Sequence, residues 1–292
     1  HITSSPFFVQ LIGKFFKSKC SAKWVVQLLD PILDNYYHNN YWISRQILGM
    51  LERTILPKAD LIITNSSRLG AILMKRYTLQ RSKLAIIPPI TIYDSIASSI
   101  TNEKLTIVHS GGIYGLRNLD YLIKAIKIHN DKYDRQESFI VELIVHCSEK
   151  EIDKISSNRL EKQIKLIGYL KSEELFSKLA GADVFLVIDA MNGEGVFFPT
   201  KLCEYFSFKK LIIGITPKEG VTADLLSEAK HKYFTPGEEE KLADFLNTLY
   251  QDRGYCNDFD RSFYRRYLPD TVAMNYLDAM AHIGLNRILG GI

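Results

Sequence analysis

From about Leu105 onward, short apolar runs alternate with stretches in which apolar residues recur every three or four positions. The runs are apolar at consecutive positions, as in Val184–Ile188, which predicts strands that are buried on both faces of a parallel sheet. The stretches between them, such as Asn118–Asn130, predict crossover helices with one apolar face. We expect strands at 105–110, 139–147, 164–168, 184–188, 211–216 and 232–235, and helices at 118–130, 149–161, 172–182, 200–209 and 221–230. Together they predict one doubly wound α/β domain.

The first hundred residues carry a different pattern. Strand-like runs and helical patterns occur there, at 23–29, 60–66 and 83–87 for the strands and at 36–55 and from Asn65-Ser66-Ser67 onward for the helices. Three strands make a poor doubly wound sheet. This part is therefore either a small accessory lobe or the later part of a domain whose first strands precede His1. The start at His rather than Met fits the second alternative.

Two breaks organise the rest of the chain. Pro88 and Pro89 open a segment without periodicity, 88–102, which we expect to be a hinge. A last helical pattern, 270–289, has no strand after it and must pack elsewhere. The expected division is therefore 1–100, 103–268 and 269–292.

Composition narrows the classes of protein further. The 292 residues are 46% hydrophobic, which supports a large buried core and excludes a disordered chain. There are 37 Lys and Arg residues against 33 Asp and Glu, a balance too even for a dedicated nucleic-acid binder. The four cysteines lie far apart and form no Cys/His cluster, so we expect reduced thiols in the cytoplasm and no metal site. No apolar run approaches the ~20 residues of a membrane-spanning helix.

A glycine-rich turn follows the first strand of the regular part. The sequence Ser110-Gly111-Gly112 leads to Arg117 and then to a predicted helix. Glycine lets the backbone approach a ligand closely, and helix amides together with a guanidinium suit a phosphate. The alternative is an ordinary tight turn, which any α/β protein needs. The turn is not a P-loop, because no Gly-Lys-Ser/Thr follows it.

A second cluster of polar residues follows the strand Val184–Ile188. Pro199 and Thr200 are the expected first residues of a helix, so that its free amides and Lys201 would face the loop. Glu204 comes one turn later, where a carboxylate can accept two hydrogen bonds from a ribose diol. The alternative is that Lys201 and Glu204 form a solvated pair on a helix face. Both clusters leave the same edge of one sheet, which favours a site for a nucleoside diphosphate.

With these two clusters, the sequence resembles the retaining glycosyltransferases of the GT-B fold, family 4 (glycosyl transferases group 1). The resemblance extends from Lys23 to Leu289, and includes the segments 23–31 and 59–66. It implies an α/β, GT-B-like fold with two Rossmann-type doubly wound domains, the first incomplete at the N-terminus. It also implies an acceptor-side domain at 1–100, a donor-binding domain at 103–268 and a helix at 269–292 that crosses back to the first domain.

The resemblance assigns roles to individual residues. A second family glutamate falls at Val196 here, and Glu194 is the nearest acid, so the implied catalytic residues are Arg117, Lys201 and Glu194. The implied donor-binding residues are Gly111, Gly112, Arg117, Tyr169, Pro199, Thr200, Lys201 and Glu204. No metal and no cofactor are implied, and Asp258-Phe259-Asp260 is interpreted as a surface loop.

The implied activity is transfer of a sugar from a UDP- or GDP-linked donor to a saccharide or lipid-linked saccharide acceptor, in surface polysaccharide synthesis. Two alternatives remain open: a nucleotide-sugar epimerase on a related fold, and a non-catalytic nucleotide-binding or interaction module. The implied location is cytoplasmic. The segment Phe7–Lys19 is apolar and basic at helical spacing, which fits either a peripheral contact with the inner face of the membrane or an ordinary amphipathic helix.

Overall fold

Two units make up the chain, and each is described by itself. The computed structural model describes residues 2–3, 7–33, 35, 41–94, 102–135, 138–191, 195–253 and 258–285. The first unit comprises His1–Ile90, Val196–Phe198 and Arg266–Ile292, and the second comprises Thr91–Gly195 and Pro199–Arg265. The chain leaves the first unit within the segment 88–102, where Pro88 and Pro89 interrupt the pattern.

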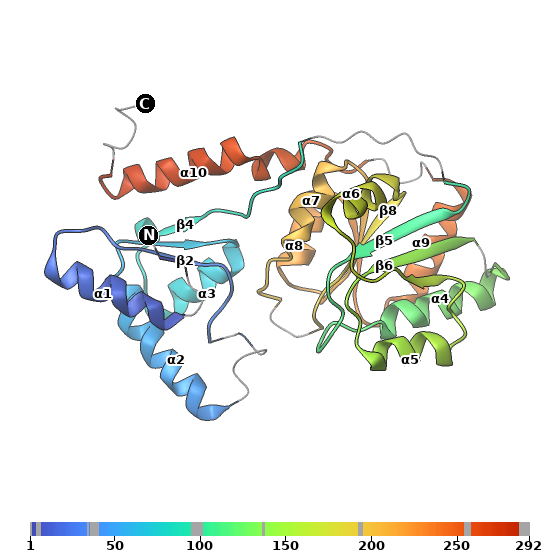
Figure 1. Cartoon of the computed structure of the whole chain (residues 1–292), viewed down its shortest axis with the longest axis horizontal. Helices are drawn as coiled ribbons and strands as arrows, with labels where there is room; N and C mark the ends of the chain where they lie inside the picture. Colours follow the sequence, from blue (N-terminus) through green and yellow to red (C-terminus); the bar gives the residue numbers. More distant parts are fainter. Residues whose placement is uncertain are drawn as a thin grey trace. The chain divides into compact units, whose positions relative to one another are not determined.

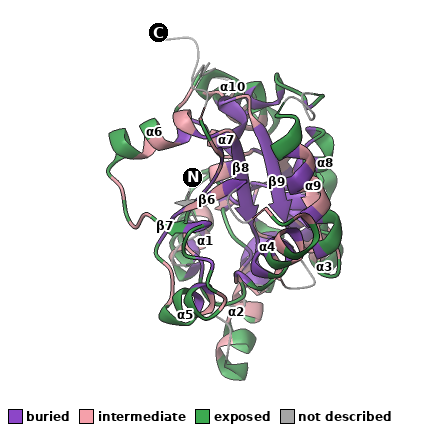
Figure 2. Ribbon diagram, turned by 90° about the vertical axis from the view of Figure 1, so that its right-hand side faces the viewer, coloured by how far each residue is buried: buried purple, intermediate pink, exposed green. Residues whose placement is uncertain are grey.

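The second unit is built on a six-stranded parallel sheet with the order β10-β9-β8-β5-β6-β7. Figure 1 labels three neighbouring strands of this sheet, β8, β5 and β6. Its strands are β5 (Leu105–Ser110), β6 (Phe139–Ile144), β7 (Ile164–Leu166), β8 (Val184–Ile188), β9 (Leu211–Ile215) and β10 (Lys232–Phe234). Every residue of β8 and β9 is buried, as Figure 2 shows for these two strands. Consecutive apolar residues are needed there because helices cover both faces. All six strands predicted from the sequence are therefore present.

Helices connect these strands, and one of them was not expected. They are α4 (Asp120–Tyr133), α5 (Glu149–Ser157), α6 (Ser172–Gly181), α7 (Lys201–Ser207), α8 (Val221–Glu228) and α9 (Glu239–Gln251). The first five match the predicted patterns with shifted ends. The sixth, α9, was missed, although Leu242, Leu246 and Leu249 lie in the same buried cluster as β5 and β6. Asp244 on α9 also pairs with Lys132 on α4 at 2.7 Å.

The first unit holds a four-stranded parallel sheet with the order β1-β2-β3-β4. Its strands are β1 (Ile2–Thr3), β2 (Val25–Leu28), β3 (Leu61–Thr64) and β4 (Leu84–Ile86). The sequence predicted only the last three, because a two-residue strand leaves no readable pattern. The sheet therefore has one strand more than expected.

Helices lie on both faces of this sheet. They are α1 (Gln10–Lys19, preceded by the 3-10 turn Phe7–Val9), α2 (Trp42–Ile55), α3 (Ser67–Tyr77) and α10 (Pro269–His282), with short 3-10 turns at Leu56–Lys58 and Arg81–Lys83. Val26 and Leu28 of β2 pack in the cluster that includes residues of α2 and α3. Val25, on the opposite face, packs with Val272 of α10. The alternation along β2 thus sends successive residues to two different cores.

Candidate functional site

The order of strands in the second unit predicts where a ligand binds. β5 pairs with β6 on one side and with β8 on the other, so the connections leave the middle of the sheet in opposite directions. In doubly wound sheets, ligands bind at such a switch point, beyond the carboxyl ends of the strands. Ser110 and Ile188 end β5 and β8 at this edge. The two polar clusters predicted from the sequence lie in the connections that follow these two strands.

The glycine turn after β5 packs against Lys201, which is distant in the sequence. Gly111 has φ of +110°, a conformation that favours glycine, and its amide donates to the carbonyl of Ile144 at 3.0 Å. A Cβ at this position would lie 3.2 Å from Nζ of Lys201, and a Cβ at Gly112 would lie 2.4 Å from the ring of Tyr114. The glycines therefore make room for side chains, and the Lys201 ammonium lies against the turn.

Lys201 is held by two acceptors from β5. Its Nζ donates to the carbonyl of Ser110 at 2.8 Å and lies 3.3 Å from Nε2 of His109. Nδ1 of His109 is 2.9 Å from the carbonyl of Leu186, so Nδ1 carries the hydrogen and Nε2 accepts from Lys201. Burial, aided by the Lys201 charge, holds the pKa of the His109 imidazole well below its usual range. A neutral imidazole thus serves as a fixed acceptor that directs the ammonium.

The cations at this edge lack a counter-charge. Burial and the charge of Arg117 lower the pKa of Lys201 to about 7, and the Asp189 carboxylate opposes this shift. Asp189 is engaged elsewhere, because its oxygens accept from the amide of Ala190 at 2.7 Å and from the Thr222 hydroxyl. Within the described ranges neither Arg117 nor Lys201 forms an ion pair, and Nε of Arg117 is buried without a hydrogen-bond partner. Two such cations side by side favour an anionic ligand.

Glu204 lies one turn after Lys201 on α7. Its side chain is partly buried, and it forms no hydrogen bond or ion pair with any described residue. Burial raises the pKa of its carboxyl group. Because the residue is three positions after Lys201, the two side chains leave the same side of the helix. The solvated Lys201–Glu204 pair considered above is absent: the lysine bonds to β5, and the carboxylate oxygens are available as acceptors.

Tyr205 fixes α7 to the end of β5. Its hydroxyl accepts from the amide of Ser110 at 2.7 Å and lies 2.9 Å from the Ser110 hydroxyl. Its fully buried ring stacks on Phe185 of β8, with centroids 4.3 Å apart. No role of Tyr205 or His109 was predicted from the sequence. His109 comes directly before the glycine turn and Tyr205 directly after Glu204, but the partners of both are distant in the sequence.

The remaining residues predicted for the site are Pro199, Thr200, Tyr169 and Glu194. α7 begins at Lys201, so Pro199 and Thr200 precede the helix. The amides of Leu202 and Cys203 donate to the carbonyls of Pro199 and Thr200 at 2.9 and 3.0 Å. These two amides are therefore not free, whereas the sequence predicted free amides at the start of the helix. Tyr169, after β7, is 92% exposed. Glu194 lies outside the described residues.

Residues 94–266 match the family described as "Glycosyl transferases group 1", which is more than half of the chain. The chain belongs to the glycosyl transferases group 1. The matched region contains the turn at Gly111, Arg117, Lys201 and Glu204. Among curated protein sequences, none matches this glycosyltransferase chain.

Solved structures show the same GT-B fold. A mutant of S. aureus TarM, in complex with fondaparinux, alpha-GlcNAc-glycerol and UDP, matches with a TM-score of 0.63 and 12% identity over 88% of this chain and 50% of TarM. Sucrose-phosphate synthase from Thermosynechococcus elongatus matches with a TM-score of 0.68 and 12% identity, over 94% of this chain and 71% of the synthase. Anabaena Alr3699/HepE in complex with UDP-glucose matches with a TM-score of 0.69 and 15% identity, over 93% of this chain and 76% of HepE. The chain thus spans about half the length of TarM.

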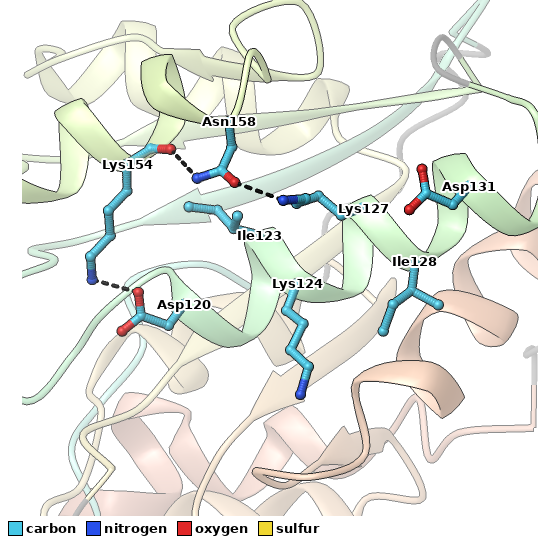
Figure 3. A pocket seen from close by; sticks show the side chains of 8 residues that line it. All are labelled: Asp120, Ile123, Lys124, Lys127, Ile128, Asp131, Lys154 and Asn158. Atoms are coloured by element: carbon cyan, nitrogen blue, oxygen red, sulfur yellow. Dashed lines mark hydrogen bonds and ion pairs between the residues drawn. The ribbon is translucent and has the colours of Figure 1, made fainter.

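A hollow of about 360 Å³ lies elsewhere in this glycosyltransferase chain, between α4 and α5 (Figure 3). Its lysines already have protein partners: Lys154 pairs with Asp120 at 2.6 Å, and Lys127 donates to Asn158 at 3.1 Å. Lys124 pairs with Glu239 at 3.3 Å. An anion would have to displace these partners, so the sheet edge with its unpaired cations is the better candidate.

Neither a metal cluster nor a membrane-spanning helix is found in the described part of the chain. No group of three or more His, Cys, Asp or Glu side chains in the described ranges could hold a metal ion. In the loop 258–260, Phe259 is buried and stacks on His231, with centroids 4.8 Å apart. No helix among the described residues is long and apolar enough to cross a bilayer.

Proposed function

We propose that this glycosyltransferase binds a UDP-linked sugar at the carboxyl edge of the second unit's sheet and transfers the sugar to a saccharide or lipid-linked saccharide acceptor. The observation that carries the proposal is the pair of cations without a counter-charge, Arg117 and Lys201, with the unpaired Glu204 carboxylate one turn away. Uridine is preferred over guanosine because structures of the same fold contain UDP or UDP-glucose.

The chemistry follows from this arrangement. When the bond between the sugar and the diphosphate breaks, negative charge builds up on the departing diphosphate. Arg117 and Lys201 stabilise that charge without needing a metal ion. Glu204 accepts hydrogen bonds from the ribose hydroxyls, so that binding energy positions the reacting carbon. His109 and Tyr205 act indirectly, by fixing the Lys201 ammonium and the helix that carries it.

We also propose roles for the other residues of the site and for the parts of the chain. Gly111 and Gly112 let the diphosphate approach the turn, Pro199 and Thr200 line the entry to α7, and Tyr169 contacts the base. Glu194 acts near the transferred sugar. Residues 1–100 form the acceptor side and 103–268 the donor side, with the hinge at 88–102 and a final helix, 269–292, that belongs with the first domain. Surface polysaccharide synthesis is the process in which we place the reaction.

The direct test is to incubate the intact chain with a panel of UDP- and GDP-sugars and to measure the nucleoside diphosphate that is released when water takes the sugar in place of the saccharide acceptor. We expect UDP to be released from at least one UDP-sugar, and the release to be lost in Arg117→Gln. Formation of an epimeric nucleotide sugar without release would instead indicate an epimerase. Binding of UDP without any turnover would contradict the enzymatic part of the proposal and leave a nucleotide-binding module.

Donor binding should depend on pH through Lys201. The pKa of this group is about 7, and a bound diphosphate raises it by stabilising the charged ammonium. Below this pKa the lysine is already charged, whereas above it binding must take up a proton. Affinity for UDP-glucose should therefore be constant at lower pH and fall by up to about tenfold per pH unit above pH 7.

Calorimetry across a pH series measures this dependence. UDP-glucose is the suitable ligand because its diphosphate is esterified at both ends and does not titrate in this range. Lys201→Arg is the matched variant, since a guanidinium stays charged throughout the series. The inflection should vanish in this variant, whatever its absolute affinity. An inflection that persists unchanged in Lys201→Arg would show that another group is responsible.

A further inference from the structure

The charges of the chain are distributed unevenly. Residues 1–90 contain twelve Lys and Arg residues but only four Asp and Glu residues. The rest of the chain contains the other 25 basic and 29 acidic residues. The total charge of +4 thus hides a strongly basic first part and an acidic remainder. Such asymmetry between parts of a chain indicates that the basic part meets a negatively charged partner.

The helix α1, in the first unit, is oriented with its apolar side outward. The exposed side chains of α1 and of the 3-10 turn before it follow helical spacing, with exposed fractions between 41% and 60%: Phe8, Leu11, Ile12, Phe15 and Phe16. The side that faces the core carries Gln10 and Gly13 instead. Gly13 is required there, because a Cβ would lie 2.2 Å from the indole nitrogen of Trp24. Close packing on Trp24 thus fixes the rotation that leaves the aromatic side chains outside.

The neighbouring helix α2 repeats this feature. Its part from Trp42 to Met50 exposes four large apolar side chains, Trp42, Ile43, Ile47 and Met50, with exposed fractions between 49% and 73%. Helices α1 and α2 contact each other, and Figure 1 shows both in the first unit. We call the exposed apolar residues of α1 and α2, with the basic residues among them, the apolar–basic face. Its exposed basic residues include Lys19, Arg45 and Arg53.

We propose that the apolar–basic face docks the first unit on a membrane surface rich in anionic lipid. Aromatic and long aliphatic side chains on one side of a helix bury themselves at the boundary between head groups and acyl chains. Lysine and arginine at the same level attract anionic head groups. The face combines both features, and the small number of acidic residues in 1–90 leaves little to oppose the attraction.

The charge and the side chains of the apolar–basic face favour a membrane over a second copy of the chain or a nucleic acid. A second copy of the chain would bring two strongly basic surfaces together, which costs free energy. A single-stranded nucleic acid would stack its bases on the exposed rings of Phe15, Phe16 and Trp42 but leave the aliphatic side chains between them in water. A membrane buries both kinds of side chain. The proposal does not depend on the donor site, because the face lies on the other unit of the chain.

Vesicle sedimentation with the intact chain tests whether the apolar–basic face binds an anionic membrane surface. The chain should sediment with vesicles that contain phosphatidylglycerol, bind much less to pure phosphatidylcholine, and be released by salt. Phe15→Ser/Phe16→Ser should weaken binding at least about tenfold, because it removes two inserted side chains. Met274→Ser, which changes an exposed apolar residue of α10, is the control and should bind like the unchanged chain. Circular dichroism verifies that each variant folds.

Tryptophan fluorescence gives an independent readout. The chain has two tryptophans, of which Trp24 is 4% exposed and Trp42 is 73% exposed. Anionic vesicles should therefore shift the emission to shorter wavelength, and Trp42→Phe should lose the shift. The proposal is overturned if neither vesicle type binds, or if Phe15→Ser/Phe16→Ser binds like the unchanged chain. Self-association that disappears in that variant, or stronger binding to an oligonucleotide than to vesicles, would overturn it in favour of the other occupants.

Discussion

Lys201→Met is expected to weaken UDP binding by about a hundredfold. The substitution removes the ammonium held by Ser110 and His109 at the glycine turn, and with it a charge-assisted hydrogen bond to the diphosphate. Losing such a bond costs about 2–3 kcal/mol, and each 1.4 kcal/mol corresponds to about a tenfold change in affinity. Isothermal titration calorimetry with UDP measures the change, and a thermal melt separates it from unfolding.

The control for this prediction is Lys127→Met. Lys127 is also a lysine of the second unit, but it donates to Asn158 in the hollow between α4 and α5 (Figure 3). Its removal should leave the UDP affinity unchanged. An affinity for Lys201→Met within about threefold of the unchanged chain would remove Lys201 from the site. Equal losses in both variants would indicate a nonspecific effect of charge.

Glu204→Ala is expected to weaken UDP binding about thirtyfold, because two hydrogen bonds from the ribose to a carboxylate are lost. The sharper prediction concerns the ligand. The unchanged chain should bind 2′-deoxy-UDP less tightly than UDP, whereas Glu204→Ala should bind the two equally. Such a double-mutant cycle isolates the contact between Glu204 and the hydroxyl.

The same titrations on Glu161→Ala provide the control. Glu161 is an exposed residue between α5 and β7, away from the carboxyl edge that carries α7. This variant should retain the preference for UDP over the deoxy ligand. If Glu204→Ala also retains the full preference, the carboxylate does not hold the ribose, and the orientation of the donor proposed above is wrong.

Much of the second unit could be predicted from the sequence because its strands are buried on both faces. A run such as Val184–Ile188 has few other stable placements. The helix α9 was missed because its first turn is formed by Glu239, Glu240 and Lys241, so that its apolar spacing starts late. The strand β1 was missed because its pairing with β2, rather than any local pattern, defines it.

The candidate site was partly predictable for a related reason. Arg117 lies in the connection that follows β5, and Lys201 and Glu204 lie on the helix that follows β8. The sheet topology brings the ends of these two strands together. The roles of His109 and Tyr205 depend on partners 77 and 95 positions away, which only the pairing of β5 with β8 and the position of α7 determine. The start of α7 was predicted one residue early, which changed which amides are free.

The central claim is that the sheet edge at Gly111, Arg117 and Lys201 binds the diphosphate of a nucleotide donor. It is tested most directly by titrating the intact chain with UDP, UMP and uridine in one calorimetric series. Affinity should fall in that order, with the largest step at the loss of the phosphate nearest the two cations. Equal affinities for all three ligands, or the tightest binding for uridine, would contradict the claim.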